Sequence, residues 1–391
     1  MITRLQVQNF KSLRKLDIPL GPLNVLVGSN MAGKSNIIDA LWFLQQAFFP
    51  EAGTQGISYA LAQRGGPSEV LWKGGEDKLL TIGIEVRDET DPGTTFKYLL
   101  EIIAGAGNFM TIQNESLKVS RVGIDFDLLR YEGGMAWLTN ADGKDLGRAN
   151  YSGSSAFQYA APNWDGYRLY ENLKQWRFYR LIPAVMKQPS LMSVGQALNV
   201  NGENISAWLM WLQANSPELF GQINEVLQDL FPDVIQVKLV PTSDGKVHLA
   251  MVEKGLKRPT TVWQASDGLL AVTALLSLIY TPPELSGTLF CIEEPENHLH
   301  PRLMETLVAL MRQVRQKLLD SKLPLGQIII TTQSPHLVDQ MSLDEIIWVE
   351  RKDGETTAYH PADKESLRKL VQNKELGLGD LMYSGALSQG K

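Results

Sequence analysis

The fold of this 391-residue chain is decided by residues 28–35, which read Gly28-Ser29-Asn30-Met31-Ala32-Gly33-Lys34-Ser35. The apolar run 23–27 before them is typical of a buried strand, and apolar residues recur at helical spacing after Ser35. A strand, a glycine-rich loop and a helix in succession form a phosphate-binding loop, whose backbone N–H groups face phosphate oxygens. We therefore expect all eight residues to line a nucleotide site, with Lys34 as its cation and the Ser35 hydroxyl as a Mg²⁺ ligand. The alternative is a chance glycine-rich turn.

Two adjacent carboxylates follow an apolar strand in the second half of the chain. Residues 289–292 are apolar and lead into Glu293 and Glu294. We predict that Glu293 holds Mg²⁺, directly or through water, and that Glu294 is the general base for the attacking water. Because neighbouring side chains on a strand point to opposite faces, the chain must turn directly after Glu293, and Pro295 suits such a turn. The alternative is a solvated acidic strand end.

The composition favours a globular protein without disulfides. The chain is 44% hydrophobic, and its single cysteine, Cys291, lies in an apolar run where a buried thiol is expected. The first residues show no export signal, and the longest apolar stretch, 269–280, is shorter than the ~20 residues of a membrane helix. We expect a cytoplasmic protein that does not enter a membrane. A net charge of −6 does not by itself indicate nucleic-acid binding.

Periodicity predicts the order of the elements. The region 78–122 reads as antiparallel sheet, whereas 133–167 is rich in Gly, Ser, Asn and Asp and reads as an irregular loop. Residues 205–230 read as two helices broken at 215–217. The remaining prediction is an α/β unit with strands at 235–240, 247–252, 288–292, 327–332 and 345–349 and helices at 268–280 and 302–319.

Three short motifs together resemble the RecF/SMC/OLD-type branch of ABC-like ATPases. They are Asn9-Phe10-Lys11-Ser12 with Asn36 after the loop, EEPENHLHP at 293–301, and TTQSP at 331–335. The resemblance covers about residues 1–75 and 260–390. It implies an α/β fold of the P-loop NTPase class, an ABC-type ATPase head with an antiparallel β subdomain and an inserted helical lobe. We expect three parts: 1–150, the N-terminal part of the head; 151–260, the helical lobe; and 261–391, the C-terminal part.

The same resemblance implies further site residues and partners. It implies ATP and Mg²⁺ as ligands, Asn36 in the nucleotide site, and a homodimer in which Ser266 and Gly268 of a Ser-x-Gly signature complete the partner's site. Ser266 is also an ordinary helix cap. Gln63 becomes a metal or water ligand. Gln333 occupies a switch position that is commonly His in the family, and because Gln cannot take a proton at neutral pH, turnover is expected to be slow.

The purpose of the ATP cycle stays open between three hypotheses. The first is a DNA-associated ATPase in repair or genome maintenance, and the second is a sensor ATPase of antiviral defence. No Asp/Glu-rich nuclease domain is visible up to Lys391, so the effector in the second hypothesis is expected on a separate protein. The third is an ATP-dependent scaffold with negligible turnover. The aromatic-basic run 176–180 is either core or a base-stacking surface.

Overall fold

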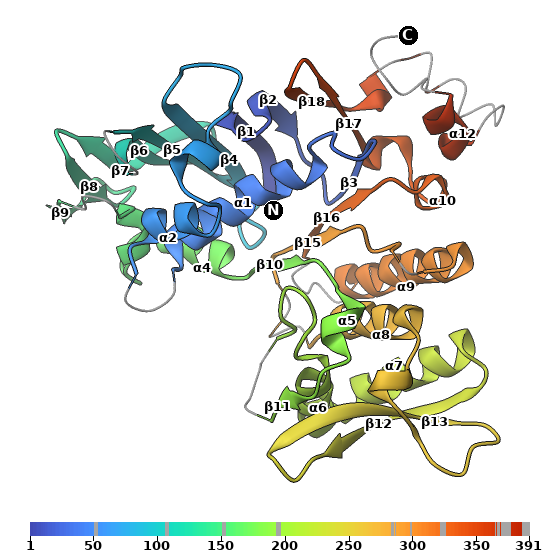
Figure 1. The fold of residues 1–391 in the computed structure, drawn as a ribbon. Helices are drawn as coiled ribbons and strands as arrows, with labels where there is room; N and C mark the ends of the chain where they lie inside the picture. The colour runs from blue at the N-terminus through green and yellow to red at the C-terminus, as the bar shows by residue number, and fades with distance from the viewer. Residues whose placement is uncertain are drawn as a thin grey trace.

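The computed structural model of the chain places its elements in three sheets with helices packed on them (Figure 1). It describes residues 1–50, 54–105, 109–150, 154–192, 197–282, 285, 287–297, 299–320, 326–363, 365, 368 and 377–384. None of the described helices is long and apolar enough to cross a membrane.

The central sheet joins strands from both halves of the chain. Its order is β10 (Trp176–Tyr179), β15 (Leu289–Glu293), β16 (Gln327–Thr332), β3 (Leu23–Val27), β17 (Ile346–Lys352) and β18 (Glu355–Tyr359), and β18 is the antiparallel edge strand of an otherwise parallel sheet. Leu26 packs in one hydrophobic cluster with α1 (Lys34–Phe48), whereas Val25 and Val27 pack in a second cluster with α8 (Asp267–Ile279). Burial on both faces explains why β3 is apolar throughout.

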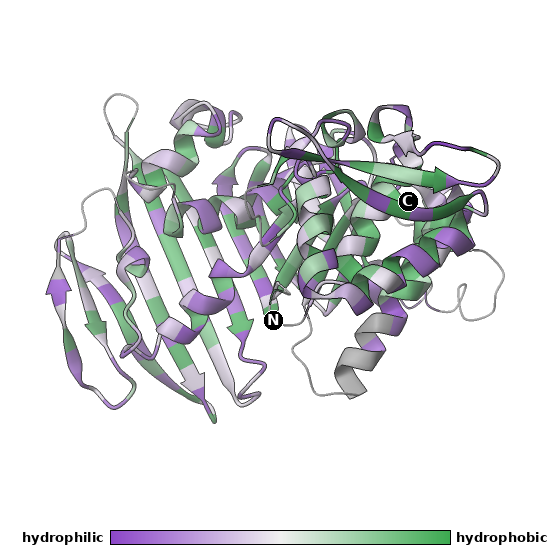
Figure 2. Cartoon of the chain, turned by 90° about the horizontal axis from the view of Figure 1, so that it is seen from below, coloured by the Kyte–Doolittle hydropathy of each residue, from purple (hydrophilic) through white to green (hydrophobic). Residues whose placement is uncertain are grey.

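A large antiparallel sheet packs against α1. Its order is β2 (Leu13–Pro19), β1 (Ile2–Phe10), β4 (Leu79–Arg87), β5 (Thr94–Ala104), β6 (Met110–Arg121), β7 (Ile124–Glu132), β8 (Met135–Thr139) and β9 (Asp145–Ala149). Residues along β5 alternate between buried and half-buried, so that one face is apolar. Figure 2 shows hydrophobic bands across these strands. The antiparallel sheet predicted for 78–122 is confirmed.

The irregular loop predicted for 133–167 is wrong in part. Strands β8 and β9 occupy this region, followed by η1 (Ala156–Tyr159). Gly133 and Gly134 have φ of 59° and 80°, which is the geometry of a tight hairpin turn between β7 and β8. The glycines that suggested a loop therefore mark a two-residue turn between paired strands.

The middle of the chain contains a small sheet as well as helices. Two-residue β11 (Ser190–Leu191), β13 (Lys246–Glu253), β12 (Val234–Pro241) and β14 (Thr260–Thr261) form this sheet, and α6 (Ile205–Asn215) and α7 (Pro217–Leu230) are the two predicted helices. Their apolar residues belong to the cluster of α8. By contrast α4 (Tyr167–Lys174) and Trp176 belong to the cluster of α1. The division at 150 and 260 stays a prediction.

Two apolar segments that the sequence singles out lie in the central sheet. Trp176, Phe178 and Tyr179 are buried in β10, so the aromatic run at 176–180 is core, and Cys291 is buried in β15 as predicted.

The remaining helices are α2 (Gly56–Ala62), α3 (Pro67–Val70), α5 (Pro183–Met186), α9 (Pro301–Asp320), α10 (Pro335–Val338) and α12 (Leu378–Tyr383).

Candidate functional site

The glycine-rich loop lies at the carboxyl end of β3 and leads directly into α1. Gly33 has φ of 103°, a left-handed conformation that favours glycine, and its carbonyl accepts the backbone N–H of Asn36 at 3.0 Å. Gly28 and Ala32 are buried, whereas Ser29, Asn30 and Met31 are exposed. The loop thus presents its central residues and the helix N-terminus outward, the arrangement that binds anions.

Lys34 is only 5% exposed and lies over its own loop. Its Nζ donates to the carbonyl oxygens of Gly28 at 2.7 Å and of Ser29 at 3.0 Å. Burial lowers the pKa of Lys34, and the carboxylates of Glu294, Glu296 and Glu293 partly offset that effect. The cation predicted for the loop is therefore held inside it, facing the acidic segment.

The hydroxyl of Ser35 meets the carboxylate of Glu293. Ser35 Oγ donates to Glu293 Oε2 at 2.7 Å, a contact between residues 258 positions apart. Hydroxyl and carboxylate oxygens are the hard donors that Mg²⁺ prefers, so this pair fits the metal. No group of three or more His, Cys, Asp or Glu residues within the described part of the chain could hold a metal ion. Phosphate oxygens would have to supply further ligands, as is usual for Mg²⁺.

Glu294 lies on the predicted turn. Its φ is 43°, an uncommon value for a residue other than glycine, and its backbone N–H donates to Thr331 O at 3.0 Å. The Glu294 carboxylate accepts a hydrogen bond from Asn297 Nδ2 at 3.0 Å. Because the chain turns here, the side chain of Glu294 does not have to point to the face of the sheet opposite Glu293. Such a turn was expected from the need to bring both carboxylates to one site. His298 of the same motif lies outside the described residues.

Glu296 is a site residue that the sequence pattern did not reveal. Its Oε1 accepts from Thr332 Oγ1 at 2.6 Å and from the backbone N–H of Gln333 at 3.0 Å, so it joins the acidic segment to the end of β16. Its Oε2 is buried and has no hydrogen-bond partner in the described structure. Burial raises the pKa of Glu296 above its ordinary value. In the sequence Glu296 stands inside the EEPENHLHP motif, three residues after Glu293, but the motif alone gives it no role.

Three predicted residues lie apart from this cluster in one chain. Ser266 caps α8, where its side chain accepts the N–H of Leu269 at 3.2 Å, and Gly268 lies in the first turn of that helix. Gln63 is exposed at the carboxyl end of α2. Among the described residues, no hydrogen bond joins the side chains of Ser266 or Gln63 to Ser35 or Glu293. Their roles stay predictions.

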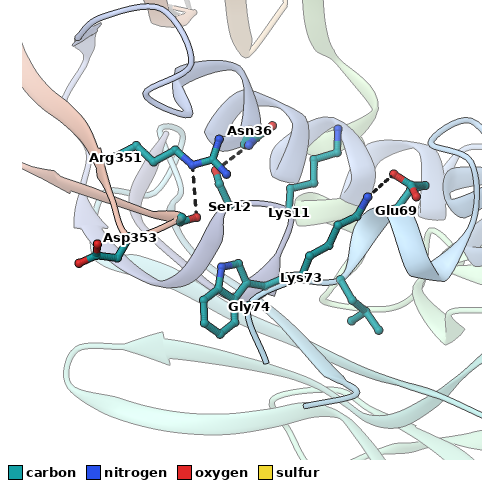
Figure 3. A pocket seen from close by; sticks show the side chains of 11 residues that line it. Lys11, Ser12, Asn36, Glu69, Lys73, Gly74, Arg351 and Asp353 are labelled. Carbon is teal, nitrogen blue, oxygen red and sulfur yellow. Dashed lines mark hydrogen bonds and ion pairs between the residues drawn. The ribbon is translucent and has the colours of Figure 1, made fainter. Parts of the chain in front are cut away.

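A pocket of about 410 Å³ adjoins the loop (Figure 3). Lys11, Ser12 and Asn36 line it near the start of α1, and Trp72 lines it from the segment after α3. The end of β17 adds Arg351. Trp72, Lys73 and Arg351 could not be assigned to this site from the sequence, because Arg351 is far from the other two in the chain. The pocket combines three cations and the carboxylates of Glu69 and Asp353 with an aromatic ring beside a phosphate-binding loop.

Two sequence families match most of the chain. Residues 1–128 match a family described as "AAA ATPase domain", and residues 161–339 match one described as "AAA domain, putative AbiEii toxin, Type IV TA system". The chain is 23% identical to the Old nuclease of Escherichia phage P2 over 95% of this chain and 63% of that protein. It is 54% identical to the OLD nuclease of Thermus scotoductus over 41 residues, which are 10% of this chain and 8% of that protein. The chain therefore spans less than two thirds of the length of these relatives.

The fold agrees with the sequence matches. The structure of an Smc head bound to the C-terminal winged-helix domain of ScpA superposes with a TM-score of 0.52 at 17% identity, covering 92% of this chain and 97% of that one. At this identity the likeness shows the fold alone. Taken with the phosphate loop, the two family matches and this fold confirm the resemblance of the chain to the RecF/SMC/OLD-type branch of ABC-like ATPases.

Proposed function

We propose that this protein hydrolyses ATP with Mg²⁺ at the loop and that hydrolysis controls the pairing of two heads. The observation that carries the proposal is the 2.7 Å contact between Ser35 Oγ and Glu293 Oε2, which brings the two predicted metal ligands together from opposite parts of the chain. Mg²⁺ bound there would neutralise charge on the β- and γ-phosphates.

Several residues of the chain would have separate roles in ATP binding and hydrolysis. The N–H groups of residues 28–35 bind phosphate oxygens, and Lys34 exchanges its bonds to Gly28 and Ser29 for bonds to phosphate. Glu294 orients the attacking water and takes its proton. Gln333 contributes a hydrogen bond to the water or the γ-phosphate. The pocket beside Asn36 has room for the nucleoside, with Trp72 available for stacking.

The signature residues support pairing of two copies. Ser266 and Gly268 lie at the exposed start of α8 and are not hydrogen-bonded to the loop of their own chain in the described structure. A helix N-terminus with a hydroxyl can address a γ-phosphate of a second copy. In this proposal ATP joins two heads, and hydrolysis releases them.

We favour DNA as the working partner, in repair or genome maintenance. The relative that aligns with 95% of this chain is called a nuclease, which favours a polynucleotide setting. A sensor that controls a separate effector protein in antiviral defence is the second candidate, since one matching family is described as a putative toxin of a toxin–antitoxin system.

The first test is steady-state phosphate release by the wild type and Lys34→Ala, each with and without single-stranded and double-ended DNA. We expect the wild type to hydrolyse ATP, and we expect DNA to stimulate this hydrolysis. Lys34→Ala should lose turnover by roughly 10²-fold or more, because the cation that contacts the phosphates is removed. Turnover that is equal in both proteins would contradict the assigned site. Turnover that depends on Lys34 but ignores DNA would favour the effector-controlling sensor.

Glu296 gives a second prediction about the same reaction. Glu296→Ala removes the acceptor that holds the backbone of Gln333, so kcat should fall by about tenfold while the Kd for ATP changes little. Glu296→Gln keeps an acceptor oxygen at that place and should remain within about threefold of the wild type. Equal losses in both variants would show that the carboxyl group has another task. The control is Glu305→Ala, which removes an exposed carboxylate on α9.

A further inference from the structure

The hairpin formed by β17 and β18 lies directly beside the phosphate loop. β17 pairs in parallel with β3, with Trp348 opposite Val27, and β18 returns antiparallel to it. The hairpin lines the pocket next to Asn36 through Arg351 at the end of β17 and through Asp353 and Gly354 of its turn (Figure 3). A segment more than 300 positions after the loop is therefore in contact with the strand, the loop and the pocket.

Both glycines of the loop are packed against this hairpin. A Cβ added to Gly28 would lie 2.1 Å from the backbone oxygen of Val349, and one added to Gly33 would lie 2.1 Å from Thr356 Oγ1. A real Cβ atom does not come this close to a heavy atom to which it is not bonded. The hairpin therefore requires glycine at both positions, in addition to the left-handed φ of Gly33.

A chain of hydrogen bonds crosses this interface. Thr356 Oγ1 donates to Ala32 O at 2.8 Å, and Ser12 Oγ lies 2.7 Å from Thr356 Oγ1. Because the Thr356 hydroxyl has only one proton, Ser12 must be the donor in that second contact. Asn36 Nδ2 in turn donates to Ser12 Oγ at 2.6 Å. Each of the two hydroxyls thus donates one hydrogen bond and accepts one. This series of hydrogen bonds begins at Asn36 of α1 and ends at Ala32 of the loop.

These groups are shielded from water. Thr356 is fully buried and Ser12 is 4% exposed. The backbone adds a further link, since the N–H of Thr356 donates to Ser12 O at 2.8 Å. A buried hydroxyl that loses its partner leaves the other group unsatisfied, which costs more than the hydrogen bond itself contributes. The loop conformation is therefore sensitive to the Thr356 hydroxyl.

We propose that Thr356 is a positioning residue for the nucleotide site and that the β17–β18 hairpin holds the phosphate loop in its anion-binding conformation. The inference rests on the proposed nucleotide binding. The ligand group concerned is the polyphosphate, because Thr356 contacts Ala32 and Gly33 of the loop and does not itself line the nucleoside pocket. The effect should accordingly be the same for ATP and for inorganic tripolyphosphate.

The test is equilibrium binding of a fluorescent ATP analogue, and its displacement by ATP and by tripolyphosphate, to the full chain. Thr356→Val keeps the shape of the side chain and removes the hydroxyl, so both displacement constants should weaken by roughly tenfold, the factor that corresponds to one lost hydrogen bond. Thr356→Ser restores the hydroxyl and should remain within about twofold of the wild type. Thr357→Val is the matched control, since Thr357 is the exposed neighbour on the same strand.

The outcomes separate this proposal from the nucleotide site itself. If the wild type and Lys34→Ala both fail to bind the analogue saturably, the proposed function fails. If the wild type binds and Thr356→Val binds equally well, or weakens for ATP but not for tripolyphosphate, the positioning role is wrong. Should Thr356→Val not fold, Ser12→Ala breaks the same series of hydrogen bonds at its centre and must weaken tripolyphosphate binding by a similar factor. Only the tripolyphosphate constant is decisive for this variant, because Ser12 also lines the nucleoside pocket. A lower melting temperature without those losses would indicate a structural role only.

Discussion

Glu294→Gln is expected to stop ATP turnover while leaving ATP binding intact. The amide cannot accept the proton of the attacking water, and general-base catalysis of this kind contributes on the order of 10²–10⁴-fold to a rate. The side chain keeps its size, and glutamine at a φ of 43° is as strained as glutamate, so folding should be unchanged. The variant should therefore accumulate in its ATP-bound form. In the proposed cycle that form is a dimer of heads.

Two measurements check this result. Phosphate release reports turnover, and light scattering with ATP and Mg²⁺ reports the mass in solution. Glu305→Gln removes a carboxylate of equal charge from the exposed face of α9 and should behave as the wild type in both. Turnover within tenfold of the wild type would exclude Glu294 as the base. A Glu294→Gln protein that binds ATP but remains monomeric would exclude dimerisation of the heads.

The local parts of the site could be predicted because neighbouring residues determine them. The apolar strand, the glycine-rich loop and the helix after it occupy one continuous stretch, and their order alone indicates a phosphate site. The turn at Glu294 also follows from local geometry, since two adjacent carboxylates on a strand cannot face one site without it. The antiparallel sheet was readable from alternation.

The contacts across the chain could not be predicted in the same way. Glu296 meets Gln333, and Thr356 meets Ala32, only after β15, β16, β3 and β17 have become neighbours in one sheet. The spacing of residues in the sequence does not indicate which strands lie side by side in the sheet. The hairpin at Gly133 and Gly134 was missed for another reason, because glycine pairs occur both in irregular loops and in two-residue turns.

Glu115 shows how one irregular pairing changes the side to which a residue points. In β6, Ile112 pairs with Ile102 and Asn114 pairs with Glu101, so Gln113 is an extra residue. Such a bulge reverses the alternation of the strand. Met110 and Ile112 are buried before it, whereas Glu115 and Leu117 are buried after it. A carboxyl group is thereby placed in the core, where alternation read from the sequence alone would not put it.

Glu115→Ala is expected to destabilise the fold by about 3 kcal/mol, because removing a buried acceptor leaves its donors unsatisfied. Glu115 Oε1 accepts from Tyr98 Oη at 2.8 Å and from Ser155 Oγ, and Oε2 accepts the backbone N–H of Ala156 at 2.9 Å. These bonds hold η1 on the antiparallel sheet, and Phe157 of η1 packs on Phe48 at the end of α1. Urea unfolding followed by tryptophan fluorescence measures the loss, with exposed Thr111→Ala on the same strand as control.

The pH dependence of this effect has a definite sign. Burial raises the pKa of Glu115, so the folded protein binds this proton more tightly than the unfolded chain does. The contribution of Glu115 to stability is therefore complete below its unfolded pKa and declines as the pH rises through the folded value. Glu115→Gln is neutral at every pH, so the advantage of the wild type over this variant should shrink as the pH rises above 4.5, the ordinary pKa of a glutamate. An advantage that grows over that range would mean that the three donors outweigh burial and keep the carboxylate ionised in the core.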